Sequence, residues 1–374
     1  MKEEDIIVGG QAVIEGVMMR APNAYSVAVR KPNGQIVSLQ ALIPPHNVRF
    51  PFLKLPIIRG SVALIHSMLL GVKALTFSAN VAIEVEEEKE GKEPTPQTQT
   101  TIFAILPAIV FNLVIFLFLP LFLTNLIFLV ARGETFSQYR EQNKVVTQSA
   151  ALSTNPVNTV TWQDKVQEVF ETAKFYARPV RPSLLFNLID GIIRMILFLG
   201  FIALISRMED IKRVFQYHGA EHKVVYNWES GESLTIENSR RQPRQHPRCG
   251  TSFLMIVMVV SIITFSIIKF DSFWLNFLAR IVLIPLVAGV SYEFIRFSAR
   301  CLATKDGELK TKKVWAVGLF KVLTAPGLWL QNITTQEPSD DQLEVAIYAL
   351  KQALQLGNPI GNQTNQTSEA LAAD

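Results

Sequence analysis

The chain has 374 residues, of which 49% are hydrophobic and only 18% are charged. Soluble domains carry about 25% charged residues, so this composition excludes a disordered chain and a purely soluble protein. The formal net charge of +4 is spread along the sequence and does not indicate a nucleic-acid partner. Cys249 and Cys301 are too few for a disulfide framework, which indicates a reducing compartment. We therefore predict an α-helical integral membrane protein.

Residues 1–56 are predicted to form a small β-rich module. Two strand-like runs, AYSVAVR and QIVSLQAL, flank an Asn33-Gly34 pair, which favours a tight hairpin turn. Residues 57–100 are expected to form an amphipathic helix and an acidic linker. Because this helix contains Arg59, His66 and Lys73 and is short for a bilayer span, we expect it to lie at the membrane interface.

Four later stretches reach the length of about 20 mostly apolar residues that a bilayer span needs. We predict spans at 102–130, 184–206, 253–268 and 274–297, within a transmembrane domain over residues 101–299. Pro107 and Pro120 favour a kink or an interruption in the first span. Only a few polar residues separate the last two spans, which predicts a helical hairpin with a tight outer turn.

The distribution of Lys and Arg predicts the topology. The loop 207–249 and the tail after the fourth span are both basic, and short basic segments stay in the cytoplasm. With four spans, the N-terminal module and both termini are then cytoplasmic, in a plasma or thylakoid-type membrane. We expect cytoplasmic or interfacial helices over 300–357, interrupted at Pro326 and Gly327 and restarted with Ser339 as the cap, and a disordered tail over 358–374. Without a secretory signal pattern, insertion is expected to rely on the internal spans.

The strongest chemical signal is the run His218-Gly219-Ala220-Glu221-His222. It fits the H-x-x-E-H pattern of one class of zinc metallopeptidases. A spacing of four residues places both imidazoles on one helix face, where they can share a metal ion. Glu221 would then lie beside the metal and act as a general base on a metal-activated water.

The same loop carries further ligand-type residues, His246 and Cys249. A site made by His218 and His222 with either His246 or Cys249 keeps an open position for water, whereas binding by all four would close the coordination and make the site structural. A loop without metal is the third alternative, because Gly219 weakens a helix and histidines of a basic loop can contact phosphate or lipid headgroups.

Ionisable residues in apolar surroundings are the remaining candidates. Glu15 lies in an otherwise apolar run, where an unpaired charge is costly, so it is either a functional carboxylate or an exposed residue on a half-buried strand. Asp190 and Arg194 are four residues apart in the second span and can pair on one helix face. With Arg280 and Glu293 of the fourth span, they either line a polar cavity or pair helix to helix.

Three motifs carry a family resemblance. VGGQAVIEGVMMRAP, AEHKVVYNWESGESLTIEN and RQHPRCGTSFL resemble the signatures of the YqhQ-like family of bacterial membrane proteins. That family is a domain of unknown function, often described as a predicted metal-dependent enzyme. The resemblance extends over nearly the whole chain. It implies a membrane architecture and a site whose members here are Glu15, His218, Glu221, His222, His246 and Cys249.

The leading hypothesis is a zinc-dependent hydrolase that cleaves a peptide or lipid bond at the cytoplasmic membrane surface. Glu221 is the expected general base, and Glu15 a carboxylate that faces the substrate or supports a metal ligand. The alternative is a non-enzymatic scaffold or assembly factor for other membrane proteins, and the third possibility is a transporter. The expected partners are the lipid bilayer and other membrane proteins. The substrate, the identity of the metal and the oligomeric state stay open.

Overall fold

The chain divides into two compact units. The computed structural model describes residues 8–43, 55–90, 110–131, 184–247, 249–268, 272–302 and 314–357, and in addition residues 107, 138, 162, 166, 169, 172, 270, 304–305 and 308–309. The first unit, here the sheet unit, comprises Met1–Phe103, Phe201–Val257 and Ala288–Asp374; the second, the helical unit, comprises Ala104–Gly200 and Met258–Val287. The predicted tail 358–374 lies outside the described residues.

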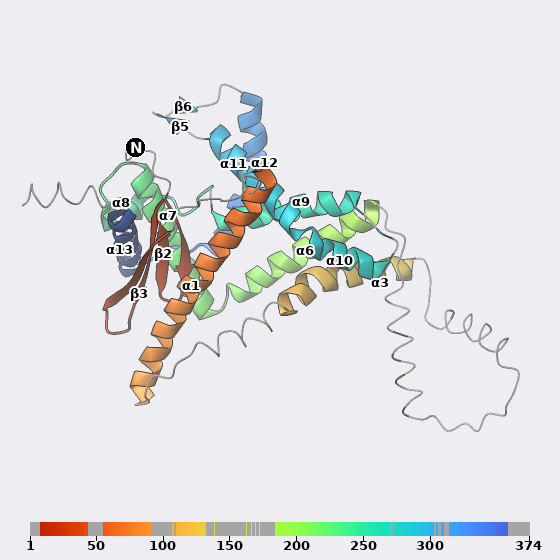
Figure 1. Cartoon of the computed structure of the whole chain (residues 1–374), viewed down its shortest axis with the longest axis horizontal. Helices are drawn as coiled ribbons and strands as arrows, with labels where there is room; N and C mark the ends of the chain where they lie inside the picture. The colour runs from red at the N-terminus through yellow and green to blue at the C-terminus, as the bar shows by residue number, and fades with distance from the viewer. Residues whose placement is uncertain are drawn as a thin grey trace, which may run out of the picture. The chain divides into compact units, whose positions relative to one another are not determined.

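The sheet unit is built on a four-stranded antiparallel meander (Figure 1). Its strands follow in chain order as β1 (Gly9–Val13), β2 (Gly16–Arg20), β3 (Ala24–Arg30) and β4 (Ile36–Leu42). The turn between β3 and β4 forms where the Asn-Gly pair predicts it. Gly34 has a φ of 86°, a conformation that glycine adopts without strain, and its N–H donates to the Lys31 carbonyl at 2.9 Å. The predicted hairpin is therefore confirmed.

Helices cover both faces of this sheet. Val17, Met19 and Ala28 point to one face, where they pack against α7 (Glu209–Glu229) and α13 (Asp340–Gly357). Because side chains alternate along a strand, Met18 and Val27 point to the other face and pack against α1 (Pro56–Glu90). The face that carries α7 is the one that positions the candidate site.

Helix α1 is longer than the sequence predicts. It spans 35 residues, and the acidic residues 84–90, expected to belong to a linker, continue it. The segment Pro56–Val85 is long and apolar enough to cross a membrane, so the helix is not short for a span. The reason is that α1 has two apolar faces: Leu70, Ala74 and Val81 are buried in the core against the sheet, while an opposite stripe that includes Ile65, Leu69 and Val72 is exposed.

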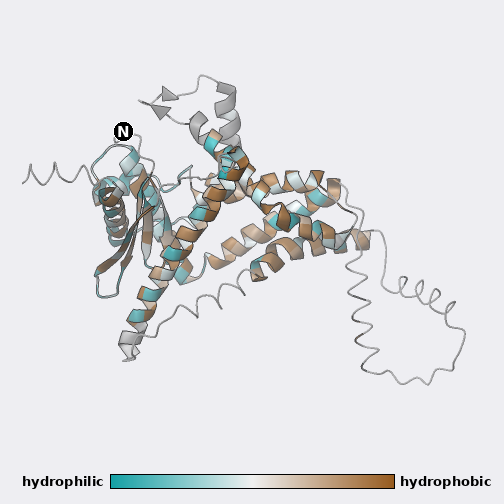
Figure 2. Ribbon diagram, viewed as in Figure 1, coloured by the Kyte–Doolittle hydropathy of each residue, from teal (hydrophilic) through white to brown (hydrophobic). Residues whose placement is uncertain are grey.

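Three of the four predicted spans are single helices that pass the same length and composition test. They are Val110–Ala131, α6 (Leu184–Ile205) and α9 (Gly250–Ile267). The fourth is a pair of helices, α10 (Phe273–Val282) and α11 (Ile284–Leu302), bent by 45° at their junction. Figure 2 shows apolar residues running along these helices. Within the described ranges, the structure therefore has four helices of membrane-spanning character, or five if the bent pair is one span.

Prolines act as expected in one helix and not in another. In the first predicted span, a π-helical turn η3 (Val114–Phe118) precedes α3 (Leu119–Ala131), and the wider turn accommodates Pro120, which has no N–H and crowds the carbonyl four residues before it. By contrast, α12 (Val314–Thr334) runs through Pro326 without the predicted interruption. The fold is completed by α8 (Ile236–Arg241) and by the short strands β5 (Thr304–Lys305) and β6 (Glu308–Leu309).

Side chains form hydrogen bonds at the starts of two helices. The side chain of Ser272 accepts a hydrogen bond from the Leu275 N–H at the start of α10. At the start of α13, the Gln342 side chain accepts from the Ser339 N–H at 3.0 Å, which is the reciprocal arm of a capping box. The helix over the C-terminal acidic and apolar run therefore begins where the cap predicts.

Candidate metal centre

Helix α7 places His218 and His222 side by side, as their spacing predicts. Their ring centroids are 4.5 Å apart. The Nδ1 atom of His218 lies 2.8 Å from the Thr334 carbonyl oxygen, and the Nδ1 atom of His222 lies 2.5 Å from that of Arg244. A carbonyl oxygen can only accept, so each Nδ1 carries the proton and donates it. In the neutral imidazole each Nε2 atom then offers a lone pair, which is the form that binds a metal.

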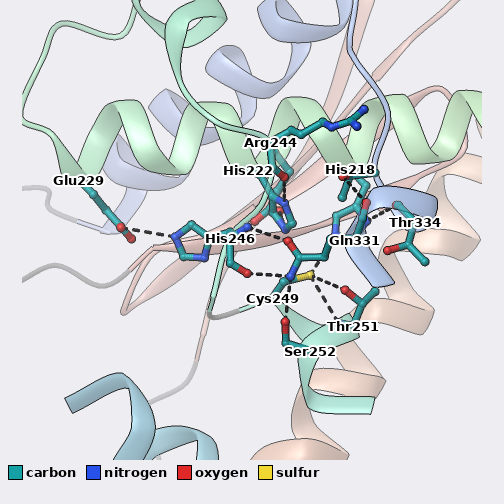
Figure 3. Close-up of polar contacts among 12 residues, drawn as sticks. His218, His222, Glu229, Arg244, His246, Cys249, Thr251, Ser252, Gln331 and Thr334 are labelled. Carbon is teal, nitrogen blue, oxygen red and sulfur yellow. Dashed lines mark hydrogen bonds and ion pairs between the residues drawn. The ribbon is translucent and has the colours of Figure 1, made fainter. Parts of the chain in front are cut away.

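Cys249 completes a group of three ligand-type side chains (Figure 3). Its Sγ atom lies 3.1 Å from the Nε2 atom of His218, and the Thr251 N–H and hydroxyl lie 3.4 and 3.2 Å from it. The residue directly precedes α9, which begins at Gly250. The Sγ atom is thus within reach of a metal ion bound at the Nε2 atom of His218, and metal binding there would release the thiol proton.

The three side chains fit a zinc ion. One ligand atom of each lies within 4.8 Å of the others. Ligand atoms around a single tetrahedral zinc are roughly 3.3–3.8 Å apart, so a small contraction closes the site. The Nε2 atom of His222 is buried and has no hydrogen-bond partner, although buried polar atoms are almost always paired. A donor set of two nitrogens and a sulfur favours zinc over magnesium and calcium, which bind oxygen ligands instead.

Glu221 lies beside this group. It is 6% exposed, and its Oε2 atom is 3.4 Å from the Nε2 atom of His222 without a hydrogen bond between them. Two atoms that both offer lone pairs repel each other at this distance unless a proton or a cation lies between them. The absence of a side chain at Gly10 makes room for Glu221, because a Cβ atom there would lie 2.7 Å from the Cγ atom of Glu221.

His246 is close to the group and is not part of it. Its ring centroid is 5.7 Å from that of His222, and its Nε2 atom lies 3.4 Å from a carboxylate oxygen of Glu229. Burial lowers the pKa of the His246 imidazole below its usual value, while the charge of Glu221 acts in the opposite direction. Of the two residues between which the sequence leaves the third ligand open, the structure thus places Cys249 with the histidine pair.

Glu15 lies in the tight turn between β1 and β2. It has a positive φ of 50°, which is uncommon for a residue with a side chain. Arg213 of α7 binds both of its carboxylate oxygens, and these hydrogen bonds raise the pKa of that guanidinium above its usual value. The structure therefore brings Glu15 together with Arg213, and among the described residues it is not a member of the ligand group. Its catalytic role stays a prediction.

The C-terminal end of α12 holds the site together, and sequence reasoning missed it. Gln331 is fully buried; its Oε1 atom accepts from the His246 N–H at 2.7 Å, and its Nε2 atom donates at 2.8 Å to the His246 carbonyl and to the Ser252 hydroxyl. It thereby fixes the chain on both sides of Cys249. Thr334, one turn later, supplies the carbonyl for His218. Because these contacts join residues about 80 or more positions apart, no local pattern could have indicated them.

Replacing Gln331 by leucine tests this arrangement. The variant keeps the volume of the side chain but leaves the buried His246 N–H without a partner, which costs about 1–3 kcal/mol. We expect a lower thermal unfolding midpoint and a zinc affinity reduced by about 10–100-fold, as for other residues that orient metal ligands. Competition with a chromophoric chelator measures the affinity, and an unchanged affinity would contradict the positioning role of Gln331.

Comparison with known proteins supports the family that the three sequence motifs indicate. The family model described as a protein of unknown function (DUF1385) matches residues 55–356. The chain belongs to this DUF1385 family. It is also 31% identical over 353 residues to the "Uncharacterized protein YqhQ" of Bacillus subtilis (strain 168), which covers 93% of this chain and 92% of that protein. No solved structure matches. The resemblance to a YqhQ-like family is thus confirmed. Because both matches are to uncharacterised proteins, the function is argued from the geometry of the site.

Proposed function

We propose that the protein is a zinc-dependent hydrolase that acts at the cytoplasmic surface of the membrane. The observation that carries the proposal is the convergence of two imidazole Nε2 atoms, of His218 and His222, and the Cys249 sulfur in one group. Three protein ligands leave one position of a tetrahedral ion open, which is typical of catalytic rather than structural zinc.

The chemistry divides between the ion and the chain. A bound zinc ion lowers the pKa of water to about 7 and polarises a carbonyl or phosphoryl oxygen. Glu221 would take the proton in this proposal, which is supported by the 3.4 Å distance between its carboxylate and the Nε2 atom of His222. His246 contacts the His222 ring and pairs with Glu229, and these two side chains would hold a polar group of the substrate.

The position of the site supports a substrate at the bilayer surface. Cys249 directly precedes α9, and α9 is long and apolar enough to span the membrane. A ligand group at the end of such a helix lies close to the lipid headgroups. The basic loop 207–249 favours the cytoplasmic side. Bonds within reach are those of phospholipids and of peptide segments that leave the bilayer.

The metal is tested first. Full-length protein, expressed with added zinc and purified in detergent, is expected to carry about one equivalent of zinc, and His218→Ala to carry far less. Less than about a tenth of an equivalent in the wild type, with no change in His218→Ala, would overturn the proposal.

The reaction is tested with Glu221→Gln. This variant is expected to retain zinc and to hydrolyse probe substrates about a hundredfold more slowly, because a general base contributes at least this much. Dye-labelled casein reports peptide hydrolysis, and a fluorogenic phosphatidylglycerol in mixed micelles reports lipid hydrolysis. Glu209→Gln, the same change at an exposed residue in the first turn of the same helix, serves as the control. Equal activity of Glu221→Gln and wild type would refute the role of Glu221.

A further inference from the structure

Helix α6 is polar on its buried face and apolar on its exposed face. Its buried residues include Asn187, Asp190 and Arg194, which recur at helical spacing. Residues such as Leu188 and Ile196 are exposed instead. A helix of a soluble protein buries its apolar face and exposes its polar face. The opposite distribution in α6 is expected for a membrane span whose outer face contacts lipid. The polar stripe therefore faces the interior of the helical unit.

The stripe belongs to a buried charge cluster. Arg194 donates to Asp190 at 3.0 Å, and Arg280 of α10 donates to the same carboxylate at 2.9 Å. None of the three residues is more than 5% exposed. Two guanidinium groups thus face one carboxylate. In the part of the helical unit that the structure describes, these are the ionisable residues, so one positive charge remains without a counter-charge there.

Two hydrogen-bond donors of the same stripe are also unused. The Nε atom of Arg194 and the Nδ2 atom of Asn187 are buried and have no hydrogen-bond partner. Both guanidinium carbons lie close to the ring of Phe265, at 5.6 and 5.4 Å from its centroid. The ring offers partial negative charge and no hydrogen-bond acceptor of comparable strength. Buried donors without an acceptor and a buried positive charge without a counter-charge are both unfavourable, and an anionic hydrogen-bond acceptor would compensate both.

We propose that Arg194 and Arg280, with Asn187, bind an oxyanion of one negative charge, a carboxylate or a phosphate group. Such a ligand supplies the missing charge and accepts from the Arg194 Nε–H and the Asn187 amide. Guanidinium groups are suited to this because their planar forks match both oxyanions. Asn187, Arg194 and Arg280 are each at most 5% exposed, so the bound group would be shielded from water, where its interaction with the arginines is strong. The anion is either carried by a lipid or free in solution.

The site is tested on delipidated full-length protein in neutral detergent. Thermal unfolding is followed at constant ionic strength in two series. One adds phosphatidylglycerol against phosphatidylcholine, and the other adds inorganic phosphate or acetate. We expect a saturable rise of the unfolding midpoint in at least one series. A response to phosphatidylglycerol alone identifies a lipid-borne anion, and a response to phosphate or acetate identifies a soluble one.

Variants at the cluster have opposite expected effects. Arg194→Gln removes the surplus charge, so the apparent affinity for the effective anion should fall at least about tenfold, as expected for a lost charge-assisted hydrogen bond. Asp190→Asn removes the competing carboxylate, so the affinity should rise. A merely structural ion-pair cluster would predict loss of stability in both variants and no change in the response to anions.

The matched control breaks an ion pair elsewhere. Arg59 donates from Nε and from its terminal nitrogen to the two oxygens of Glu293, at 2.7 and 2.5 Å, within the sheet unit. Arg59→Gln should lower stability and leave the anion response unchanged. If Arg194→Gln does not fold, Arg280→Gln removes the same charge. The absence of a saturable response in both series, or equal responses of wild type and both arginine variants, would overturn the proposal.

Discussion

Replacing His222 by alanine is expected to lower the zinc affinity of the protein by about a thousandfold. The apparent binding free energy of zinc sites is about 10–16 kcal/mol, and each of three ligands carries a share of roughly 3–5 kcal/mol. His222 is fully buried and its Nε2 atom has no other hydrogen-bond partner, so no neighbouring group takes over its role. Chelator competition on purified protein measures the change.

His246→Ala is the matched comparison, because it removes an imidazole of the same loop that contacts the His222 ring and lies outside the ligand group. We expect it to change the zinc affinity by less than about tenfold. A second readout uses the two cysteines of the chain. In a Cys301→Ser background, zinc should slow alkylation of Cys249, and His222→Ala should abolish this protection. If His246→Ala lost as much zinc as His222→Ala, His246 would be a ligand and the group of three would be wrong.

Local patterns were sufficient for part of the site. The four-residue spacing of His218 and His222 predicts two adjacent imidazoles, and the rings are adjacent on α7. The Asn33-Gly34 pair likewise predicts the hairpin, because the turn depends only on the conformations open to these residues. Such features are encoded within a few residues, so a sequence alone is enough to predict them.

The third ligand could not be predicted in the same way. His246 and Cys249 are three residues apart in a loop, and both are good zinc ligands. The choice between them depends on Gln331, which holds the His246 backbone from a helix 85 residues further along the chain. Tertiary hydrogen bonds of this kind leave no periodic or local signal.

The membrane-facing elements illustrate a second difficulty. The length of the apolar runs identifies three of the predicted spans, which are single helices in the structure, since a long apolar run has few alternatives. In α1 one apolar face packs on the sheet and the opposite one is exposed. Periodicity reports the sum of the two faces, so the sequence underestimates both the length and the apolar character of this helix.

Gly219 is the residue at which sequence reasoning and structure differ most. A glycine within a helix costs about 1 kcal/mol relative to alanine, which counted against a helix over the histidine motif. In the structure α7 passes through Gly219, and a Cβ atom there would lie 2.0 Å from the carbonyl oxygen of Gln336. The glycine is needed because the chain after α12 crosses α7 at this point. The N–H of Gln336 donates to the Phe215 carbonyl at 2.9 Å.

Gly219→Ala is therefore expected to destabilise the protein although it improves helix propensity. The methyl group must push the segment after Thr334 away from α7, and overpacking of this kind costs about 1–3 kcal/mol. The same displacement breaks the hydrogen bond from His218 to the Thr334 carbonyl, so we expect the zinc affinity to fall about 10–100-fold. Thermal unfolding with and without zinc, together with chelator competition, measures both effects.

Gly200→Ala provides the control for Gly219→Ala. Gly200 lies within α6, and a Cβ atom there would meet nothing within 4 Å. This substitution should be neutral or stabilise the protein by up to about 1 kcal/mol, because only helix propensity changes. If Gly219→Ala behaved like Gly200→Ala and kept full zinc affinity, the close crossing at α7 would not orient His218. The combination of lower stability and weaker zinc binding in Gly219→Ala alone is the outcome that ties this glycine to the metal centre.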